Sequence, residues 1–168
     1  MSTNTTTTQV DVRGPRFAAW VTTVVIVATL LAASVSALAA AVILGVQAIV
    51  FAIGAWRGPR QHPYGLIFGR VVLPRLGPVT EKEPVPPLKF AQLVGFVFAV
   101  VGVVGFGSDI TLLGLIATGF ALVAAFLNAA FGICLGCQIY PLVARLRRAP
   151  TPYHAQTASN RKEFVHGS

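Results

Sequence analysis

Long stretches without charge constrain this chain more than any other feature. No Asp, Glu, Lys or Arg occurs in residues 17–56, 90–108 or 110–144. About 20 apolar residues of helix cross the hydrocarbon core of a bilayer, so the first stretch is long enough for two spans and each of the others for one. Charged residues make up 11% of the chain, against about 25% in a soluble domain. The sequence therefore predicts an all-α integral membrane protein with four transmembrane helices.

The length of the first stretch also predicts where the chain reverses. One helix over residues 17–56 would be about 60 Å long, roughly twice the thickness of the hydrocarbon core. A turn is therefore expected within residues 34–40, and the four spans are expected to form two antiparallel hairpins. The predicted organisation is a disordered polar tail at 1–12, a membrane domain at 13–148 and a disordered cytoplasmic tail at 149–168. Within the membrane domain, spans are expected at about 17–36, 38–56, 90–107 and 111–132, and a cytoplasmic loop is expected at 57–89.

The basic residues predict the orientation in the membrane. The chain has a net charge of +8, and all 13 Lys and Arg lie before the first predicted span, in the middle loop, or after residue 144. This is the positive-inside pattern, which places both termini and the middle loop in the cytoplasm; it explains the charge better than nucleic-acid binding does. Trp20 and Trp56 are predicted interfacial anchors. A basic cytoplasmic face is expected from Arg57, Arg60, Arg70, Arg75, Arg145, Arg147 and Arg148.

The middle loop differs in composition from the spans. It holds seven of the eleven prolines. Its "YGLIFGRVVLPRL" segment mixes apolar residues with arginines, which predicts a partly helical amphipathic segment at the interface. Its "GPVTEKEPVPPLK" segment predicts an extended linker.

Both cysteines of the chain, Cys134 and Cys137, form a C-x-x-C pair after the fourth span. This spacing occurs in redox and metal sites, but a structural zinc site needs four ligands. The other candidate ligands are His62, His154 and His166, the last two in the predicted disordered tail, so no metal is predicted within one chain, and a site shared with a partner stays open. Two interpretations stay open: a reactive cytoplasmic dithiol or persulfide carrier, or two small residues that only pack. Reactivity is favoured if the sulfurs lie at a helix start and disfavoured at a helix end. A break is expected, because Gly132 and Gly136 permit it and Pro141 clashes with the preceding turn.

Uncharged polar residues in the spans are predicted to join helices. Asn128, Gln47 and Gln92 are expected to make interhelical hydrogen bonds. No titratable residue lies within a predicted span, which argues against ion pumps and proton-coupled transporters. The sequence contains no nucleophile-elbow, metalloprotease or phosphate-loop motif, so it predicts no cofactor and favours no enzymatic class.

A weak internal repeat runs through the chain. "RFAAWV" at Arg16 resembles "KFAQLV" at Lys89, and each precedes a predicted pair of spans. "RGPRQHPYGLI" and "CLGCQIYPLV" follow the two pairs. The pattern is compatible with a parallel duplication and equally with chance similarity of apolar segments.

Four segments together resemble a known family of small bacterial membrane proteins. They are "DVRGPRFAAWV", "FAIGAWRGPRQHPYGLIF", "PRLGPVTEKEPVPPLKFAQLVGFVFA" and "LNAAFGICLGCQIY". Over about residues 10–145 the chain resembles the domain-of-unknown-function 4395 family, common in actinobacteria. The resemblance implies a multi-pass protein of the bacterial plasma membrane. Family members are often encoded beside thioredoxin-like proteins and sulfurtransferases, which implies a thiol or sulfur role for Cys134 and Cys137.

Three functions follow as hypotheses. The first is a membrane component of thiol-redox or sulfur-transfer metabolism that serves a soluble thioredoxin-like or sulfurtransferase partner. The second is a non-enzymatic accessory subunit of a larger membrane complex, for example a respiratory one. The third and weakest is a small-molecule channel or transporter.

Overall fold

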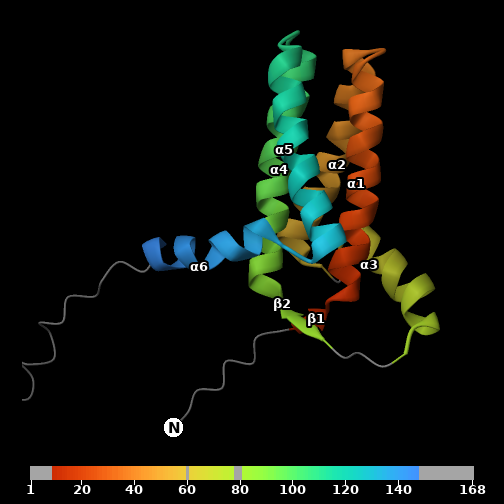
Figure 1. Ribbon diagram of the computed structural model, residues 1–168, viewed down its shortest axis with the longest axis vertical. Coiled ribbons are helices and arrows are strands. Elements are labelled where there is room, and N and C mark those ends of the chain that lie inside the picture. Colours follow the sequence, from red (N-terminus) through yellow and green to blue (C-terminus); the bar gives the residue numbers. More distant parts are fainter. Residues whose placement is uncertain (1–8, 60, 78–80, 148–168) are drawn as a thin grey trace, which may run out of the picture.

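Four long helices form a bundle in the computed structural model, which describes residues 9–59, 61–77 and 81–147 (Figure 1). Each is long and apolar enough to cross a membrane, so the prediction of four such helices is confirmed. The spanning candidates are α1 (Arg13–Ala33), α2 (Ala37–Arg57), α4 (Val85–Gly107) and α5 (Thr111–Phe131).

The four helices expose more apolar side-chain surface than a protein in water normally does. At most 33% of the residues in the most apolar part of each helix are buried within the chain. Val24, Leu31, Val46 and Leu112 are each more than half exposed. A soluble protein rarely exposes large contiguous apolar patches, so lipid is the solvent that matches this surface.

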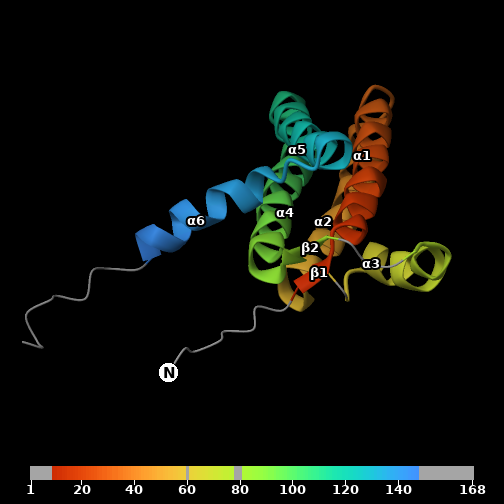
Figure 2. The same cartoon turned by 60° about the horizontal axis from the view of Figure 1, so that its bottom comes forward.

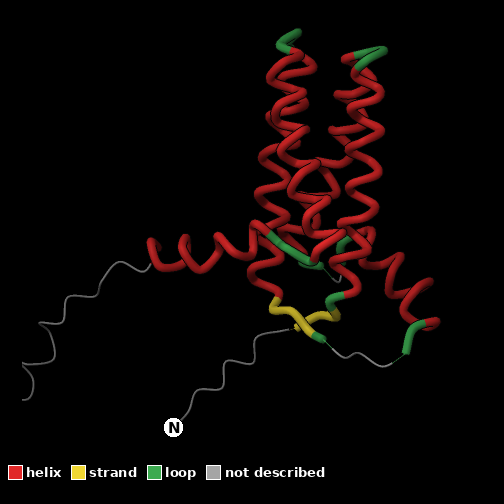
Figure 3. Tube along the Cα trace, in the orientation of Figure 1, coloured by secondary structure: helices red, strands yellow, loops and turns green. Residues whose placement is uncertain are grey.

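Each helix of the bundle packs mainly on two neighbours. α1 packs against α2 and α5, and α4 packs against the same two helices. The buried core follows the contact between α2 and α4 and includes Leu44, Phe51 and Phe106. Short turns at residues 34–36 and 108–110 join consecutive helices at one end of the bundle, and Figure 3 shows both turns at that end.

The other end of the bundle carries all the remaining described elements, as the turned view also shows (Figure 2). We call it the basic end, because every basic residue within the described ranges lies there, whereas the opposite end carries Asp109. Its elements are β1 (Gln9–Asp11), α3 (Pro63–Ile67), the π-helix η1 (Phe68–Val72), the 3₁₀-helix η2 (Leu73–Arg75), β2 (Lys82–Pro84) and α6 (Leu135–Arg147).

Two predictions at the basic end were wrong. Gln9–Asp11 does not belong to a disordered tail, because it pairs with Lys82–Pro84 as an antiparallel two-stranded sheet. An ion pair of 3.1 Å between Arg13 and Asp11 holds the strand next to α1. α4 begins at Val85 rather than residue 90, because prolines fit the first turn of a helix, where their missing N–H is not needed.

The halves of the chain share one packing pattern. α3 packs against α1, the first long helix of its half, and α6 packs against α4, the first of the other half. Phe90 of α4 and Tyr140 of α6 form an aromatic pair with ring centroids 6.0 Å apart, and Phe17 of α1 pairs at 5.8 Å with Phe68, the first residue of η1 directly after α3. The packing therefore agrees with the duplication interpretation of the internal repeat.

Candidate functional site

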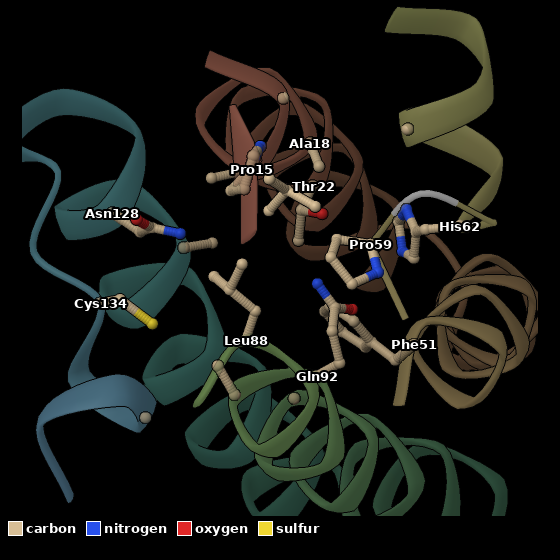
Figure 4. A pocket seen from close by; sticks show the side chains of 18 of the residues that line it. Pro15, Ala18, Thr22, Phe51, Pro59, His62, Leu88, Gln92, Asn128 and Cys134 are labelled. Atoms are coloured by element: carbon tan, nitrogen blue, oxygen red, sulfur yellow. The ribbon is translucent and has the colours of Figure 1, made fainter. Parts of the chain in front are cut away.

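A cavity of about 850 Å³ opens between the helices in the half of the bundle nearest the basic end (Figure 4). Its wall is mostly apolar and includes Ala18 of α1, Leu88 of α4 and Ile139 of α6. The polar groups that line it come from separate parts of the sequence. They are Asp11, Thr22, His62, Arg70, Lys82, Gln92, Asn128 and Cys134.

The helical structure is interrupted between α5 and α6, just before the cysteines. α5 ends at Phe131, and Gly132 takes the left-handed conformation with φ 69°, which glycine adopts without steric cost. The N–H groups of Gly132 and Ile133 donate to carbonyls of the last turn of α5 at 3.1 and 3.2 Å. Arg16 of α1 covers this turn, since a Cβ on Gly132 would lie 3.1 Å from its Cζ atom.

Cys134 and Cys137 lie at the start of a helix. The N–H of Gln138 donates to the carbonyl of Cys134 at 3.1 Å, which is the first helical bond of α6. The N–H of Cys137 donates to Sγ of Cys134 at 3.3 Å, so Cys134 fills the N-cap position. A disulfide joins the two residues, whose Cα atoms are 5.2 Å apart. A helix N-terminus favours negative charge, and this position therefore favours the thiolate form of a reduced Cys134.

Two of the three predicted break residues do not lie in the break. Gly136 lies inside α6 and is buried, because α6 crosses close over α4 there: a Cβ on Gly136 would be 2.6 Å from Cα of Ala91. Pro141 also lies inside α6. Its missing N–H leaves only the carbonyl of Cys137 without its helical donor, and the contacts of Gly136 and Tyr140 with α4 hold the turn of α6 that precedes Pro141.

The three predicted interhelical amides differ in their partners. Oε1 of Gln47 in α2, which is 1% exposed, accepts a hydrogen bond of 2.7 Å from the Tyr64 hydroxyl, so this bond joins α2 to α3. Oε1 of Gln92 is buried and has no hydrogen-bond partner among the described residues. Asn128 lines the cavity, and its amide makes no hydrogen bond to another long helix in the described part of the chain.

His62 is the main site residue that the sequence did not predict. Its ring is 2% exposed, packs edge-to-face on Tyr64 with centroids 5.1 Å apart, and lines the cavity. Nε2 of His62 has no partner within the described ranges. Gly54 of α2 makes room for it, since a Cβ there would meet both His62 and Gln92. The sequence shows only a histidine in a proline-rich loop, which predicts exposure.

Burial of His62 predicts acid sensitivity. It lowers the His62 pKa from 6.5 to about 4, so between these pH values the unfolded chain binds a proton that the folded chain does not. The contribution of His62 to the free energy of unfolding is therefore complete above pH 6.5 and falls by about 3 kcal/mol on acidification to about pH 4. We expect the thermal midpoint of the detergent-solubilised protein to fall more steeply with acidification than that of His62→Gln.

The His62→Gln comparison isolates this one group. Burial also raises the pKa of Glu83, which stabilises the fold on acidification, but Glu83 is present in both proteins and cancels in the difference. Equal slopes of midpoint against pH in the two proteins would contradict the assignment to His62.

The predicted basic face and anchors lie at the basic end. Arg57, Arg70, Arg75 and Arg145 are exposed; Arg70 also lines the cavity. Only the backbone of Arg147 is described, and Arg60 and Arg148 lie outside the described residues. Trp20 is 49% and Trp56 86% exposed, as side chains at a membrane interface would be. No group of three His, Cys, Asp or Glu that could hold a metal occurs in the ranges that the structure describes.

The four apolar helices indicate a multi-pass helical membrane protein. The chain belongs to the family described as Domain of unknown function (DUF4395), whose model matches residues 10–145. This match confirms the resemblance seen in the sequence segments. Comparison with curated proteins and with solved structures finds no match.

Proposed function

We propose that the protein is a membrane-embedded thiol–disulfide exchange protein whose Cys134–Cys137 pair takes electrons from a soluble dithiol partner. The single observation that carries this function is a C-x-x-C disulfide with Cys134 at the N-cap of α6 and at the rim of a cavity. A helix start is the position at which such pairs become reactive. Two small residues that only pack have no need of that position.

The proposed orientation places the basic end in the cytoplasm. The concentration of arginines and lysines at that end supports it through the positive-inside rule. The two termini, the middle loop and α6 then lie on the cytoplasmic side of a bacterial plasma membrane, and the four spans form two antiparallel hairpins. A soluble partner of thioredoxin type would dock there, beside exposed Arg70, Arg75 and Arg145.

The exchange follows from the surroundings of the two sulfurs. Cys134 lines the cavity, whereas Cys137 lies outside it. Attack is faster when the departing thiolate is the more stable one, and the N–H of Cys137 stabilises Cys134. The partner's thiolate therefore attacks Sγ of Cys137, the Cys134–Cys137 bond breaks, and Cys134 leaves as a thiolate. A second partner thiol then attacks the mixed disulfide, which leaves a disulfide on the partner and two thiols on this chain.

Thiol exchange in oriented vesicles tests this function. Oxidised protein in inside-out membrane vesicles is mixed with a reduced thioredoxin-like protein, quenched with acid and alkylated. We expect both cysteines to gain one alkyl group each, measured by mass spectrometry, while the partner loses two thiols. Right-side-out vesicles are the matched control and should show no reaction.

Two outcomes would contradict the proposal. Cysteines that stay oxidised in inside-out vesicles under excess partner contradict thiol exchange. Reaction confined to right-side-out vesicles contradicts the proposed orientation.

A further inference from the structure

Turnover of the proposed exchange requires an electron acceptor for the reduced pair. Each cycle leaves two thiols on the chain, and Cys134 is the one that lines the cavity. In Figure 4 its sulfur points toward the open space between the helices. The acceptor should therefore be a molecule that occupies the cavity.

Two residues that line the cavity, His62 and Gln92, carry buried polar atoms without partners in the described part of the chain. Nε2 of His62 and Oε1 of Gln92 are buried and make no hydrogen bond with any described residue. An unpartnered buried polar atom costs about 1–3 kcal/mol, which a ligand with suitable oxygens would offset. A neutral imidazole can donate to a carbonyl or accept from a hydroxyl, and an amide oxygen accepts from a hydroxyl. Figure 4 shows His62 and Gln92 across the cavity from Cys134 and Asn128.

The part of the wall that α5 forms fits an apolar chain. Along α5 the lining extends from Phe120 to Asn128, a distance of about 12 Å at the rise of a helix. Small-molecule sites have volumes of about 300–1,000 Å³, and about 850 Å³ lies in the upper part of that range. The ligand should therefore combine a flat polar head with a hydrocarbon tail.

We propose that the cavity binds an isoprenoid quinone, which accepts the electrons of the reduced Cys134–Cys137 pair. This inference rests on the proposed exchange function and names its second substrate. The two thiols lose two electrons and two protons and form the disulfide. The quinone gains the same two electrons and two protons and becomes the quinol. Its head lies between Cys134 and Asn128 on one side and His62 and Gln92 on the other, with the tail toward Phe120.

Quinone reduction by the purified, prereduced protein tests the site. A short-chain ubiquinone and a short-chain menaquinone serve as probes, and the quinone absorbance and the thiol count are followed together. We expect one quinol for each two thiols lost. Ala125→Leu fills the cavity and should lower kcat/KM for quinone at least about tenfold, the effect of about 1.4 kcal/mol. Ala130→Leu, on the exposed face of α5, is the matched control and should change it less than about twofold.

A second variant separates binding from folding. Gln92→Leu removes a buried oxygen that has no protein partner, so it should leave the thermal midpoint unchanged or raised while raising the KM for quinone about tenfold. Both cavity variants should exchange thiols with the soluble partner at the wild-type rate.

Three results would overturn the inference while leaving thiol exchange intact. One is exchange with the partner but no quinone reduction by the wild type. Another is equal quinone kinetics in Ala125→Leu and Ala130→Leu. The third is organic extraction of the purified protein that yields phospholipid and no quinone, together with no saturable binding of the added quinones.

Discussion

Replacement of Cys134 by serine is expected to stop turnover and to trap the soluble partner on Cys137. The variant keeps the thiol that lies outside the cavity and loses Cys134, which in a reduced pair attacks the mixed disulfide on Cys137 and releases the partner. A partner with a single thiol, activated as a mixed disulfide with a chromogenic thiol, should therefore become linked to Cys134→Ser for hours, seen as a mass increase on non-reducing gels, because neither chain then has a second thiol to break the link. The rate of partner oxidation should fall to background, a loss of at least about 1,000-fold, because exchange through one sulfur cannot complete the cycle.

Cys137→Ser is the matched variant and should behave differently. Its remaining thiol lines the cavity and lies at the N-cap of α6. It should stop turnover equally but capture little of the bulky partner, while a small lipophilic maleimide should alkylate it. Its alkylation rate should reach half-maximum at a pH below about 8.5, the ordinary pKa of a cysteine thiol. Partner capture by Cys137→Ser and not by Cys134→Ser would reverse the assigned order of the two sulfurs.

Gly105→Ala is expected to be the most destabilising single methyl addition in the bundle. A Cβ at this position of α4 would meet the backbone nitrogen of Gly114 and lie 2.8 Å from its Cα atom in α5. Backbone cannot rotate away as a side chain can, so the two helices must separate. Overpacking costs about 1–3 kcal/mol, and the thermal midpoint in detergent should fall accordingly.

Gly119→Ala provides the control for Gly105→Ala. A Cβ on Gly119 would have no neighbour within 4 Å, and alanine is favoured over glycine inside a helix by about 0.5–1 kcal/mol. The midpoint should stay equal or rise. Similar losses in both variants would contradict the assignment of the effect to the contact of α4 with α5, because helix propensity alone favours alanine at both positions.

The pattern of charges was sufficient to predict the four long helices. The thickness of the bilayer sets the length of a spanning helix, so the length of each uncharged stretch shows how many spans it can form. The short elements were harder to predict. Gln9–Asp11 became a strand only because Lys82–Pro84, far along the chain, offers it a partner, and an unpaired strand has no local signature in a polar segment.

The site was only half predictable for the same reason. Gly132 sits in the break, as the preference of glycine for left-handed backbone suggests. Gly136 was assigned to the break by the same local rule and Pro141 by its clash with the preceding turn, but both lie inside α6, which packs on α4. Nothing in the sequence around His62 predicts burial, since that depends on Gly54 of another helix lying against the ring.

The sequence by itself determined that this chain has four helices suited to a membrane, which family it belongs to, and that its two cysteines follow the last of those helices. Each of these properties follows from stretches of residues that are consecutive in the sequence. Only the tertiary structure decided that the cysteines begin a helix and do not end one, and that Cys134 lines a cavity beside Asn128 and opposite His62 and Gln92. Those relations join residues that are distant along the chain, and packing in three dimensions alone brings them together.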